Sequence, residues 1–466
     1  MRFSLVAPTV SLRMTLRNAA LLLALSTSVA FGQTVSTVLN FNGPNGASPF
    51  LVTLIQGRDG NLYGTTSNGG ANGVGAVVRI DPSTGSSMVM HSFDSANGSN
   101  PGAGLTLATS GNFYGTTVSG GSATVGVLYS LTAGGVYTVL HQFLGGTDGS
   151  YPYGPPIQAN DNNFYGATSG GPNGDPATIY KLTPSGAYSV IYTFDQATSG
   201  NDVYGLTQGT DNLLYATANG GGSANCGAIA RVSTVGVLHG LRAFDCVHSG
   251  GAPVATLTQA SDGNYYGTNL SGGTDGGGTL FQITPMLGLT IFHRFGAIGD
   301  GNEPQGPLVQ GTDGNLYGTT VKSYNGGPSA LYSSSLSGTY SLLYTFPGAP
   351  YVSGGLMQHT GGLFYGDAMI GGTHNFGFIY SLNMGLGPFI AFVHAQGQVG
   401  GTAQILGQGL TGTTSVTFNG IAATSFTVVS DTFMTVVVPT GAGTGPVVVT
   451  TPSGTLTGNK NFTVSE

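Results

Sequence analysis

The octapeptide Asp-Gly-Asn-Leu-Tyr-Gly-Thr-Thr occurs at residues 59–66 and again, unchanged, at residues 313–320. Its tyrosine recurs between and beyond these copies, in steps of 51, 51, 50, 51, 51 and 48 residues, at Tyr63, Tyr114, Tyr165, Tyr215, Tyr266, Tyr317 and Tyr365. A period near 50 residues indicates repeated supersecondary units and is typical of propeller blades. The sequence therefore predicts an all-β, seven-bladed β-propeller over residues 34–384.

Each repeat contains four short β-prone segments separated by turn residues. In the sixth repeat these segments are 306–310, 316–320, 330–332 and 340–346. Asp313-Gly314, between the first two, supplies the positive φ angles of a tight hairpin, and the strands are rich in β-branched and aromatic residues. The 82 glycines are too many for helices and follow no collagen period. Four antiparallel strands in about 50 residues make one propeller blade.

The count of fourth strands predicts how the ring closes. Six repeats end in a strand with a terminal phenylalanine, at Phe93, Phe143, Phe194, Phe244, Phe295 and Phe346, whereas the seventh repeat has no such strand. A spare copy, Ser36–Phe41, precedes the first tyrosine. We therefore expect residues 35–41 to pair with the strand near residues 378–382, which would protect the exposed edges of both.

The tyrosine pattern stops at Gly385-Leu386-Gly387-Pro388. Residues 388–466 instead contain about seven short strands, which is typical of an immunoglobulin-like β-sandwich. This segment has only three charged residues, Asp431, Lys460 and Glu466. We therefore expect neither a metal site nor a charged catalytic pair in it.

Residues 1–30 have the pattern of a secretory signal peptide. Arg2, Arg13 and Arg17 form a basic region, an apolar run spans 19–25, and Ser28-Val29-Ala30 fits a cleavage site. An uncleaved anchor is the alternative reading, but the apolar run is short for a membrane span. We expect export, to the periplasm, the cell surface or the medium, with no membrane span after cleavage.

The charge balance excludes some partners. Loss of residues 1–30 removes three arginines and no acidic residue, which takes the formal net charge from −7 to −10. A sparse negative surface argues against nucleic acid, which binds basic surfaces, and against anionic membranes. We expect a monomer without a cofactor.

The two cysteines, Cys226 and Cys246, both lie in the fourth repeat. Export makes a structural disulfide between them plausible. In the chain-entropy treatment such a loop closure stabilises the fold by about 3 kcal/mol. Two buried free thiols are the alternative, and a redox or metal role is disfavoured because no Cys-x-x-Cys spacing is present.

Two family resemblances follow from these residues. Residues 34–384 resemble the bacterial GloVer tandem-repeat ("choice-of-anchor") proteins in the octapeptide, in glycine doublets such as Gly69-Gly70 and in the terminal phenylalanine strand, and depart from them at Tyr215-Ala216 and at 365–367. Residues 388–466 resemble an IPT/TIG domain in the elements Gly397, Gly400, Ile405-Leu406-Gly407, 416–420, Val438-Pro439 and Phe462. The first resemblance implies export and surface display without an established biochemical role. The second implies an immunoglobulin-like fold used for interaction or spacing. Four residues follow Phe462, so we expect none of the group's C-terminal anchors here.

We expect a structural role for the histidines and aspartates that could otherwise bind a metal ion. His91, His141 and His293 each stand two residues before a fourth-strand phenylalanine, and such equivalence predicts a shared packed, hydrogen-bonded role rather than a metal ring. The turn aspartates Asp59, Asp161, Asp211, Asp262 and Asp313 offer one carboxylate per turn, too few for calcium. The densest oxygen cluster, 300–303, is the remaining calcium candidate.

We find no catalytic constellation, and we predict no catalytic and no metal-binding residue. The leading interpretation is a non-catalytic propeller that binds or displays an extracellular carbohydrate or protein, with exposed tyrosines and Asn/Gly loops suited to such surfaces. The binding residues are not identified by the sequence. A polysaccharide lyase or glycosidase, using acids such as Asp202, Glu303 or Asp367, is the second interpretation, and a structural envelope component is the third.

Overall fold

A computed structural model describes residues 33–466 except 51, 103, 172–173, 196–199, 298–299, 322–327, 349 and 466. The predicted signal peptide, residues 1–30, lies outside the described residues. Residues 33–466 form one compact unit. Within the described part of the chain, no helix is long and apolar enough to cross a membrane. One short 3₁₀ helix, η1, spans Gly146–Asp148.

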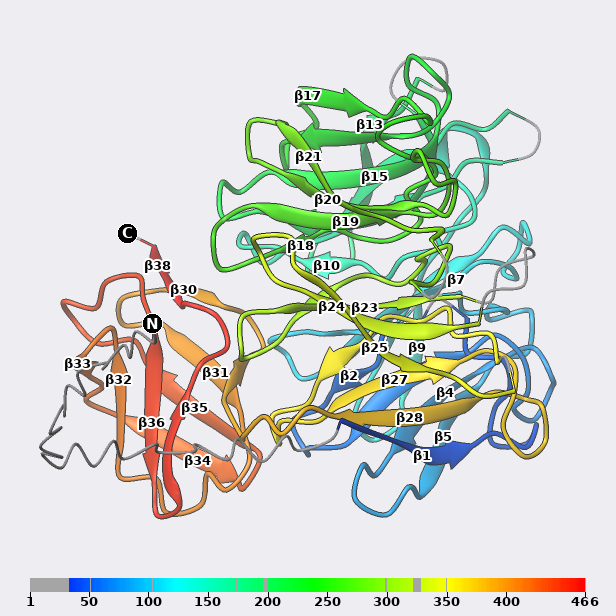
Figure 1. The fold of residues 1–466 in the computed structure, drawn as a ribbon. Helices are drawn as coiled ribbons and strands as arrows, with labels where there is room; N and C mark the ends of the chain where they lie inside the picture. The colour runs from blue at the N-terminus through cyan, green and yellow to red at the C-terminus, as the bar shows by residue number, and fades with distance from the viewer. Residues whose placement is uncertain are drawn as a thin grey trace, which may run out of the picture. The chain divides into compact units, whose positions relative to one another are not determined.

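The repeats fold into four-stranded antiparallel sheets, one per repeat in the described residues (Figure 1). The first three sheets contain β2 (Ile55–Gln56), β3 (Leu62–Thr66), β4 (Ala76–Ile80) and β5 (Ser87–Ser92); β6 (Thr106–Leu107), β7 (Phe113–Thr117), β8 (Val127–Leu131) and β9 (Tyr137–Gln142); and β10 (Ile157–Gln158), β11 (Phe164–Thr168), β12 (Thr178–Leu182) and β13 (Tyr188–Thr193).

The next four sheets continue the series. They contain β14 (Asn201–Gln208), β15 (Leu214–Gly220), β16 (Ala228–Val232) and β17 (Leu238–Ala243); β18 (Thr258–Gln259), β19 (Tyr265–Asn269), β20 (Thr279–Ile283) and β21 (Leu289–Arg294); β22 (Val309–Gln310), β23 (Leu316–Thr320), β24 (Ala330–Ser334) and β25 (Tyr340–Thr345); and β26 (Met357–Gln358), β27 (Phe364–Ala368) and β28 (Phe378–Asn383) with β1 (Thr34–Asn40). The predicted four-stranded repeat is confirmed.

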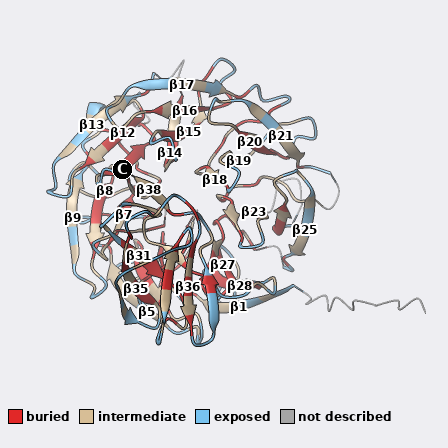
Figure 2. Ribbon diagram, turned by 90° about the vertical axis from the view of Figure 1, so that its left-hand side faces the viewer, coloured by how far each residue is buried: buried red, intermediate tan, exposed pale blue. Residues whose placement is uncertain are grey.

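Burial is highest in the second and third strands of the sheets, lower in the short first strands, and lowest in the fourth strands. The octapeptide strand β23 is buried throughout, whereas the fourth strand β25 alternates between partly buried and exposed residues. Figure 2 shows the same gradient, with exposed residues on β9, β13, β17 and β25. Glycine follows the repeat tyrosine for a packing reason: a Cβ atom at Gly318 would overlap the Tyr332 ring on the neighbouring strand.

The expectation of many exposed tyrosines is wrong for the repeats. The tyrosines that are buried to 3% exposure or less are Tyr63, Tyr129, Tyr165, Tyr180, Tyr215, Tyr265, Tyr266, Tyr317, Tyr332, Tyr365 and Tyr380. The physical reason is that a large aromatic side chain fills the space between neighbouring sheets. Stacked pairs such as Tyr63 and Phe113, with ring centroids 4.2 Å apart, join consecutive repeats.

The predicted closure by the N-terminal strand is confirmed. β1 pairs antiparallel with β28, from Thr34 opposite Asn383 to Asn40 opposite Phe378, and becomes the fourth strand of the last sheet. The amide of Phe41 donates to the carbonyl of Gly377 at 3.1 Å. The Phe41 side chain is buried in a cluster that joins the last sheet to the first.

The segment after β28 forms further sheets around its own apolar core. One sheet has the order β29 (Ala391–Phe392), β31 (Thr402–Leu406), β35 (Phe433–Val437), β34 (Phe426–Ser430). A second has the order β33 (Ile421–Ala422), β32 (Ser415–Phe418), β36 (Val447–Thr451), β37 (Gly454–Thr457), and β30 (Gln396–Gln398) pairs in parallel with β38 (Thr463–Ser465). Ile405, Val449 and Phe462 belong to the shared core.

Polar contacts tie this C-terminal segment to turns of the repeats. The Arg58 guanidinium donates to the side-chain oxygen of Gln404 at 2.6 Å and lies 4.5 Å from the centre of the Phe433 ring. The Thr432 hydroxyl donates to the carbonyl of Arg58 at 2.7 Å. Burial lowers the pKa of the Arg58 guanidinium.

Removal of the closing strand tests the ring directly. Deletion of residues 34–42 leaves β28 with an unpaired edge and removes Phe41 from the core, so we expect the melting temperature to fall by about 10 °C or more. Differential scanning calorimetry measures the change. Substitution of the exposed Ser36 on the same strand by alanine is the matched control and should leave the melting temperature unchanged. An unchanged melting temperature after the deletion would refute the closure.

Candidate functional site

The turn aspartates are bound to the repeat tyrosines. A carboxylate oxygen of Asp313 accepts a hydrogen bond from the Tyr317 hydroxyl at 2.7 Å, and its other oxygen accepts from the amide of Asn315 at 3.2 Å. The same bond to tyrosine, at 2.7–3.0 Å, joins Asp59 to Tyr63, Asp161 to Tyr165, Asp211 to Tyr215 and Asp262 to Tyr266. The structural interpretation of these aspartates is therefore confirmed. The sequence analysis missed the tyrosine partner, although the constant spacing of four residues signals it.

The repeated histidines lock neighbouring sheets together. The His141 ring stacks on Tyr188 with centroids 3.6 Å apart, and its Nε2 lies 3.0 Å from an Asp148 oxygen. His293 stacks on Tyr340 in the same way, at 3.8 Å, and meets Asp300 at 3.1 Å. The predicted packed, hydrogen-bonded role is confirmed for both of these residues.

His91 repeats the stack but not the hydrogen bond. Its ring lies 3.8 Å from the Tyr137 ring, while its buried Nε2 has no partner among the described residues. The residue seven positions on is Gly98, where the other two repeats have Asp148 and Asp300. Burial lowers the pKa of His91, which keeps the ring neutral at pH 7.

The oxygen cluster at 300–303 is used within the fold. Asp300 meets His293 through one oxygen and accepts the amide of Gly296 through the other, at 3.1 Å. The amide of Glu303 donates to the carbonyl of Gly277. Across the described residues, no group of three or more His, Cys, Asp or Glu side chains could hold a metal ion.

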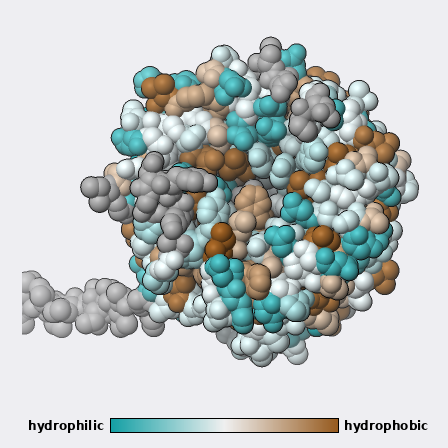
Figure 3. Space-filling view, turned by 90° about the vertical axis from the view of Figure 1, so that its right-hand side faces the viewer, coloured by the Kyte–Doolittle hydropathy of each residue, from teal (hydrophilic) through white to brown (hydrophobic). Residues whose placement is uncertain are grey.

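The connections of each sheet lie at two opposite ends of its strands. One end holds the Asp-Gly-Asn turns between first and second strands. The other end, which we call the loop end, holds the connections from second to third strands and those from the fourth strand to the next repeat. Figure 3 looks onto the loop end, where small hydrophobic areas lie between hydrophilic ones.

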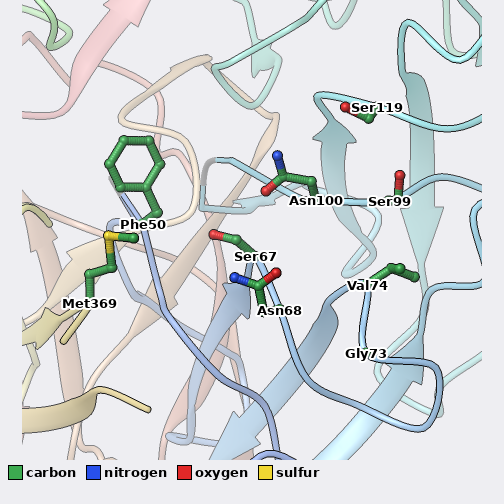
Figure 4. A pocket seen from close by; sticks show the side chains of 9 residues that line it. All are labelled: Phe50, Ser67, Asn68, Gly73, Val74, Ser99, Asn100, Ser119 and Met369. Carbon is green, nitrogen blue, oxygen red and sulfur yellow. The ribbon is translucent and has the colours of Figure 1, made fainter. Parts of the chain in front are cut away.

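One cavity opens at the loop end between the seventh, first and second sheets. It has a volume of about 440 Å³ and is lined by Phe50, Ser67, Asn68, Gly73, Val74, Ser99, Asn100, Ser119 and Met369. We call it the mouth cavity. Figure 4 shows Phe50 and Met369 on one side of it and Ser99 and Ser119 on the other, with Asn68 and Asn100 between them. None of the nine lining residues is ionisable, so the cavity offers hydrogen bonds and apolar contact without charge.

Backbone hydrogen bonds hold the polar side of the mouth cavity. The amide and the hydroxyl of Ser67 both donate to the carbonyl of Ser48, at 3.2 and 2.9 Å. The amide of Asn100 donates to the carbonyl of Val74 at 2.8 Å, and its own carbonyl accepts from Val118 at 3.0 Å. The bond from Asn100 to Val74 joins the second repeat to the first, and the other bonds lie within one repeat. Together they preorganise the cavity wall.

A second cavity, of about 330 Å³, opens at the loop end beside the fourth and fifth sheets. Its lining residues are Asn201, Asp202, Asn219, Gly220, Asn225, Cys226, Cys246, Gly251, Ala252 and Ser271. We call it the acidic cavity, because it contains the Asp202 carboxyl. Partial burial raises the pKa of that carboxyl. The structure joins Cys226 and Cys246 as a disulfide beside it, with Cα atoms 5.5 Å apart.

The three acids considered for catalysis occupy different repeats. Asp202 and Glu303 take equivalent positions two repeats apart at the loop end, whereas Asp367 lies inside β27 and is fully buried. The equivalent strand position is threonine in five of the other repeats and alanine, Ala167, in the third. Thr319, for example, donates its hydroxyl to the carbonyl of Gly354 at 3.0 Å. Burial holds the pKa of Asp367 well above its usual range, and neither of its oxygens has a hydrogen-bond partner among the described residues.

The stack of four-stranded sheets and the cavities at their loop ends define a propeller-like, all-β repeat protein. The chain belongs to the Gloeobacter/Verrucomicrobia repeat family, whose profile matches residues 25–229 and 175–361. No curated protein matches the chain.

Solved structures agree on the fold. A virginiamycin B lyase from Staphylococcus aureus, crystallised as an inactive variant with quinupristin, is 14% identical with a TM-score of 0.55, over 75% of this chain and 99% of the other. The selenomethionine form of that lyase gives 0.54 at the same identity and coverage. At this identity the similarity concerns the fold alone.

Replacement of Asp367 tests how much the buried carboxyl group lowers the free energy of unfolding. Asp367→Thr restores the hydroxyl donor of five other repeats, so we expect the free energy of unfolding to rise by about 1–3 kcal/mol. Because the pKa of Asp367 is raised in the folded state, its contribution to stability is present below pH 3.8 and is lost as the pH rises.

The gain from Asp367→Thr should therefore be larger at pH 8 than at pH 5. Urea unfolding at both pH values measures it. The reverse substitution, Thr319→Asp, is the matched control and should destabilise the protein. An equal gain at the two pH values would mean that the carboxyl does not titrate as described.

Proposed function

We propose that this chain is an exported, non-catalytic binding protein. In this proposal a seven-bladed propeller carries an immunoglobulin-like domain of the IPT/TIG type, and the propeller binds a carbohydrate at its loop end. The observation that carries the proposal is the lining of the mouth cavity: serine, asparagine and glycine, with one aromatic, one valine and one thioether side chain and without an ionisable group.

The size and chemistry of the mouth cavity suit a sugar. Its volume of about 440 Å³ falls within the range of ordinary ligand sites. Ser67, Asn68 and Asn100 offer donors and acceptors for hydroxyl groups, while Phe50 and Met369 offer apolar surface for the carbon face of a pyranose ring. A short oligosaccharide can thus form hydrogen bonds with the polar side of the cavity and apolar contacts with the other side.

Other features support export and display. The basic and apolar pattern of residues 1–30 is that of a signal peptide, and a disulfide between Cys226 and Cys246 suits an oxidising compartment. The C-terminal segment contacts the turn of Arg58, at the end of the strands opposite to the mouth cavity. That placement lets the segment act as a spacer while the loop end meets the ligand.

A polysaccharide-acting enzyme is the second candidate, favoured by one observation. The raised pKa of Asp202 at the acidic cavity is the property of a general acid. Glycoside hydrolysis requires a second carboxyl group within about 5–10 Å. Among the described residues that line that cavity, Asp202 is the only one with a carboxyl group, so this candidate ranks below binding.

A polysaccharide panel separates the two candidates. Residues 31–466 are incubated with insoluble polysaccharides, and both the retained protein and the released soluble sugar are measured. Retention without release is the expected result. Release would overturn the non-catalytic assignment, and the absence of both signals would overturn carbohydrate binding and favour a protein ligand.

Variants of the mouth cavity locate the binding. Phe50→Ala and Asn68→Ala should each weaken retention about ten-fold, since each removes about 1.4 kcal/mol of contact. Val136→Ala, at an exposed position in an outer hairpin, is the control and should bind as the unmodified protein does. Equal retention of all three variants would place the ligand elsewhere.

A further inference from the structure

Six residues at the loop end share an unusual backbone conformation. The residue that leads into the first strand of a repeat has a φ of +53° to +59° without being glycine, at Ser48, Asn100, Tyr151, Asp202, Ala252 and Glu303. These positions follow one another in steps of 50–52 residues. We call them the left-handed ring. A left-handed φ costs free energy for most side chains, and only asparagine, aspartate and glycine adopt it readily.

Backbone hydrogen bonds explain the left-handed conformation of the ring residues, but they do not explain why these residues carry side chains. The amide of each ring residue donates to a loop carbonyl of the preceding repeat, as from Glu303 to Gly277 at 2.8 Å. In five of the six, all except Asp202, the ring carbonyl accepts from the residue just after the second strand, as Tyr151 does from Ser169 at 3.2 Å. Glycine would form the same bonds without strain. In a chain with 82 glycines, the presence of other residues at these strained positions points to a role for their side chains.

The surroundings of the ring are constant while its side chains differ. Proline follows the ring residue in five repeats, at Pro49, Pro101, Pro152, Pro253 and Pro304. All five of these prolines pack where a Cβ atom on a glycine of the preceding repeat would lie, as Pro101 does against Gly75. The ring residues themselves are Ser, Asn, Tyr, Asp, Ala and Glu. A rigid frame that presents a different side chain in each repeat is the arrangement of a specificity surface.

The ring reaches both cavities. Asn100 lines the mouth cavity, and Asp202 and Ala252 line the acidic cavity. At the acidic cavity Asp202 is accompanied by Asn219 and Ser271, which are neutral hydrogen-bonding side chains. No cation and no hydrogen-bond donor among the described residues acts on the pKa of the Asp202 carboxyl; burial alone raises it.

Two tyrosines of the third and fourth repeats pack against each other. Tyr153 and Tyr204 lie with ring centroids 5.0 Å apart, and both are half-buried. After burial, the charge of Asp202 also contributes to the raised pKa of each of these tyrosines. A half-buried carboxylate at a cavity, with no cationic partner among the described residues, attracts a cation.

We propose that the left-handed ring determines ligand specificity at the loop end, and that its member Asp202 recognises the ammonium group of an amino sugar. The assignment rests on the proposed carbohydrate binding and extends it to a substrate class. An ammonium group would meet the desolvated carboxylate as its counter-ion, and the neighbouring amides would bind ring hydroxyls. A calcium ion fits less well, because it requires six to eight oxygen ligands and usually several carboxylates.

The test compares two soluble probes that differ only in the amine. Fully deacetylated and fully N-acetylated glucosamine hexamers are titrated into residues 31–466 at pH 6 by calorimetry, with the protein unmodified and as Asp202→Asn. Asparagine keeps the size of the side chain and tolerates the left-handed φ. We expect Asp202→Asn to weaken binding of the deacetylated hexamer about ten-fold or more and to leave the N-acetylated hexamer within about two-fold.

Asp275→Asn is the matched control. Asp275 is an exposed acid in a loop-end connection of the fifth repeat and lines neither cavity, so its replacement removes the same charge without touching the site. We expect both hexamers to bind this variant as they bind the unmodified protein. Equal weakening by Asp275→Asn and Asp202→Asn would reduce the effect to net charge and overturn the proposal.

The remaining outcomes separate this proposal from the proposed function. Binding of both hexamers with no selective loss in Asp202→Asn would overturn the role of Asp202 and leave carbohydrate binding intact. Binding of neither hexamer, nor of any polysaccharide in the panel, would overturn carbohydrate binding itself and the present proposal with it. A lysine hexapeptide that binds as tightly as the deacetylated hexamer, with the same loss in Asp202→Asn, would assign the acidic cavity to a protein ligand and overturn the sugar assignment.

Discussion

The pairing of β1 with β28 is the interaction on which the other features of the repeat region depend. Each sheet needs the next repeat to bury one of its two faces. Pairs such as Tyr114 and Phe164, whose ring centroids lie 4.0 Å apart, make this contact. A row of such sheets has two unburied ends unless the last sheet meets the first. β1 completes the last sheet, and Phe41 joins Leu54 and Tyr365 in one cluster across that junction. Closure therefore sets the positions of the loops that line both cavities.

In the closed ring, the ionisable side chains that stabilise the fold and the residues available for binding lie in different places. Most carboxylates and imidazoles suggested by the sequence are bound within the fold, as in the pairs Asp313 with Tyr317 and His293 with Asp300. These contacts rigidify turns and outer strands. The loop end instead consists of short connections between strands. Glycine and, in five repeats, proline recur in these connections, whereas the residue of the left-handed ring differs from repeat to repeat. A repeat protein can change its ligand there without altering its core.

Much of the fold could be predicted from the sequence, because tyrosine spacing, turn residues and the spare Phe41 strand are local patterns that the packing preserves. The sites could not be predicted. The left-handed φ of Tyr151 or Glu303 results from hydrogen bonds between repeats, and neither residue type signals it. The mouth cavity combines Phe50, Asn100 and Met369, which lie far apart in the chain. Asp367 showed as a departure from the repeat, but its complete burial depends on neighbouring strands.

The central claim is that the propeller-like repeats bind their ligand at the loop end. Hydrogen–deuterium exchange of residues 31–466, with and without a polysaccharide that retains the protein, measures this most directly. The account predicts slower exchange in loop-end connections such as 67–75 and 118–126, with unchanged exchange in the turns at 59–61 and 313–315 and in residues 388–466. Protection confined to residues 388–466 or to those turns would contradict it.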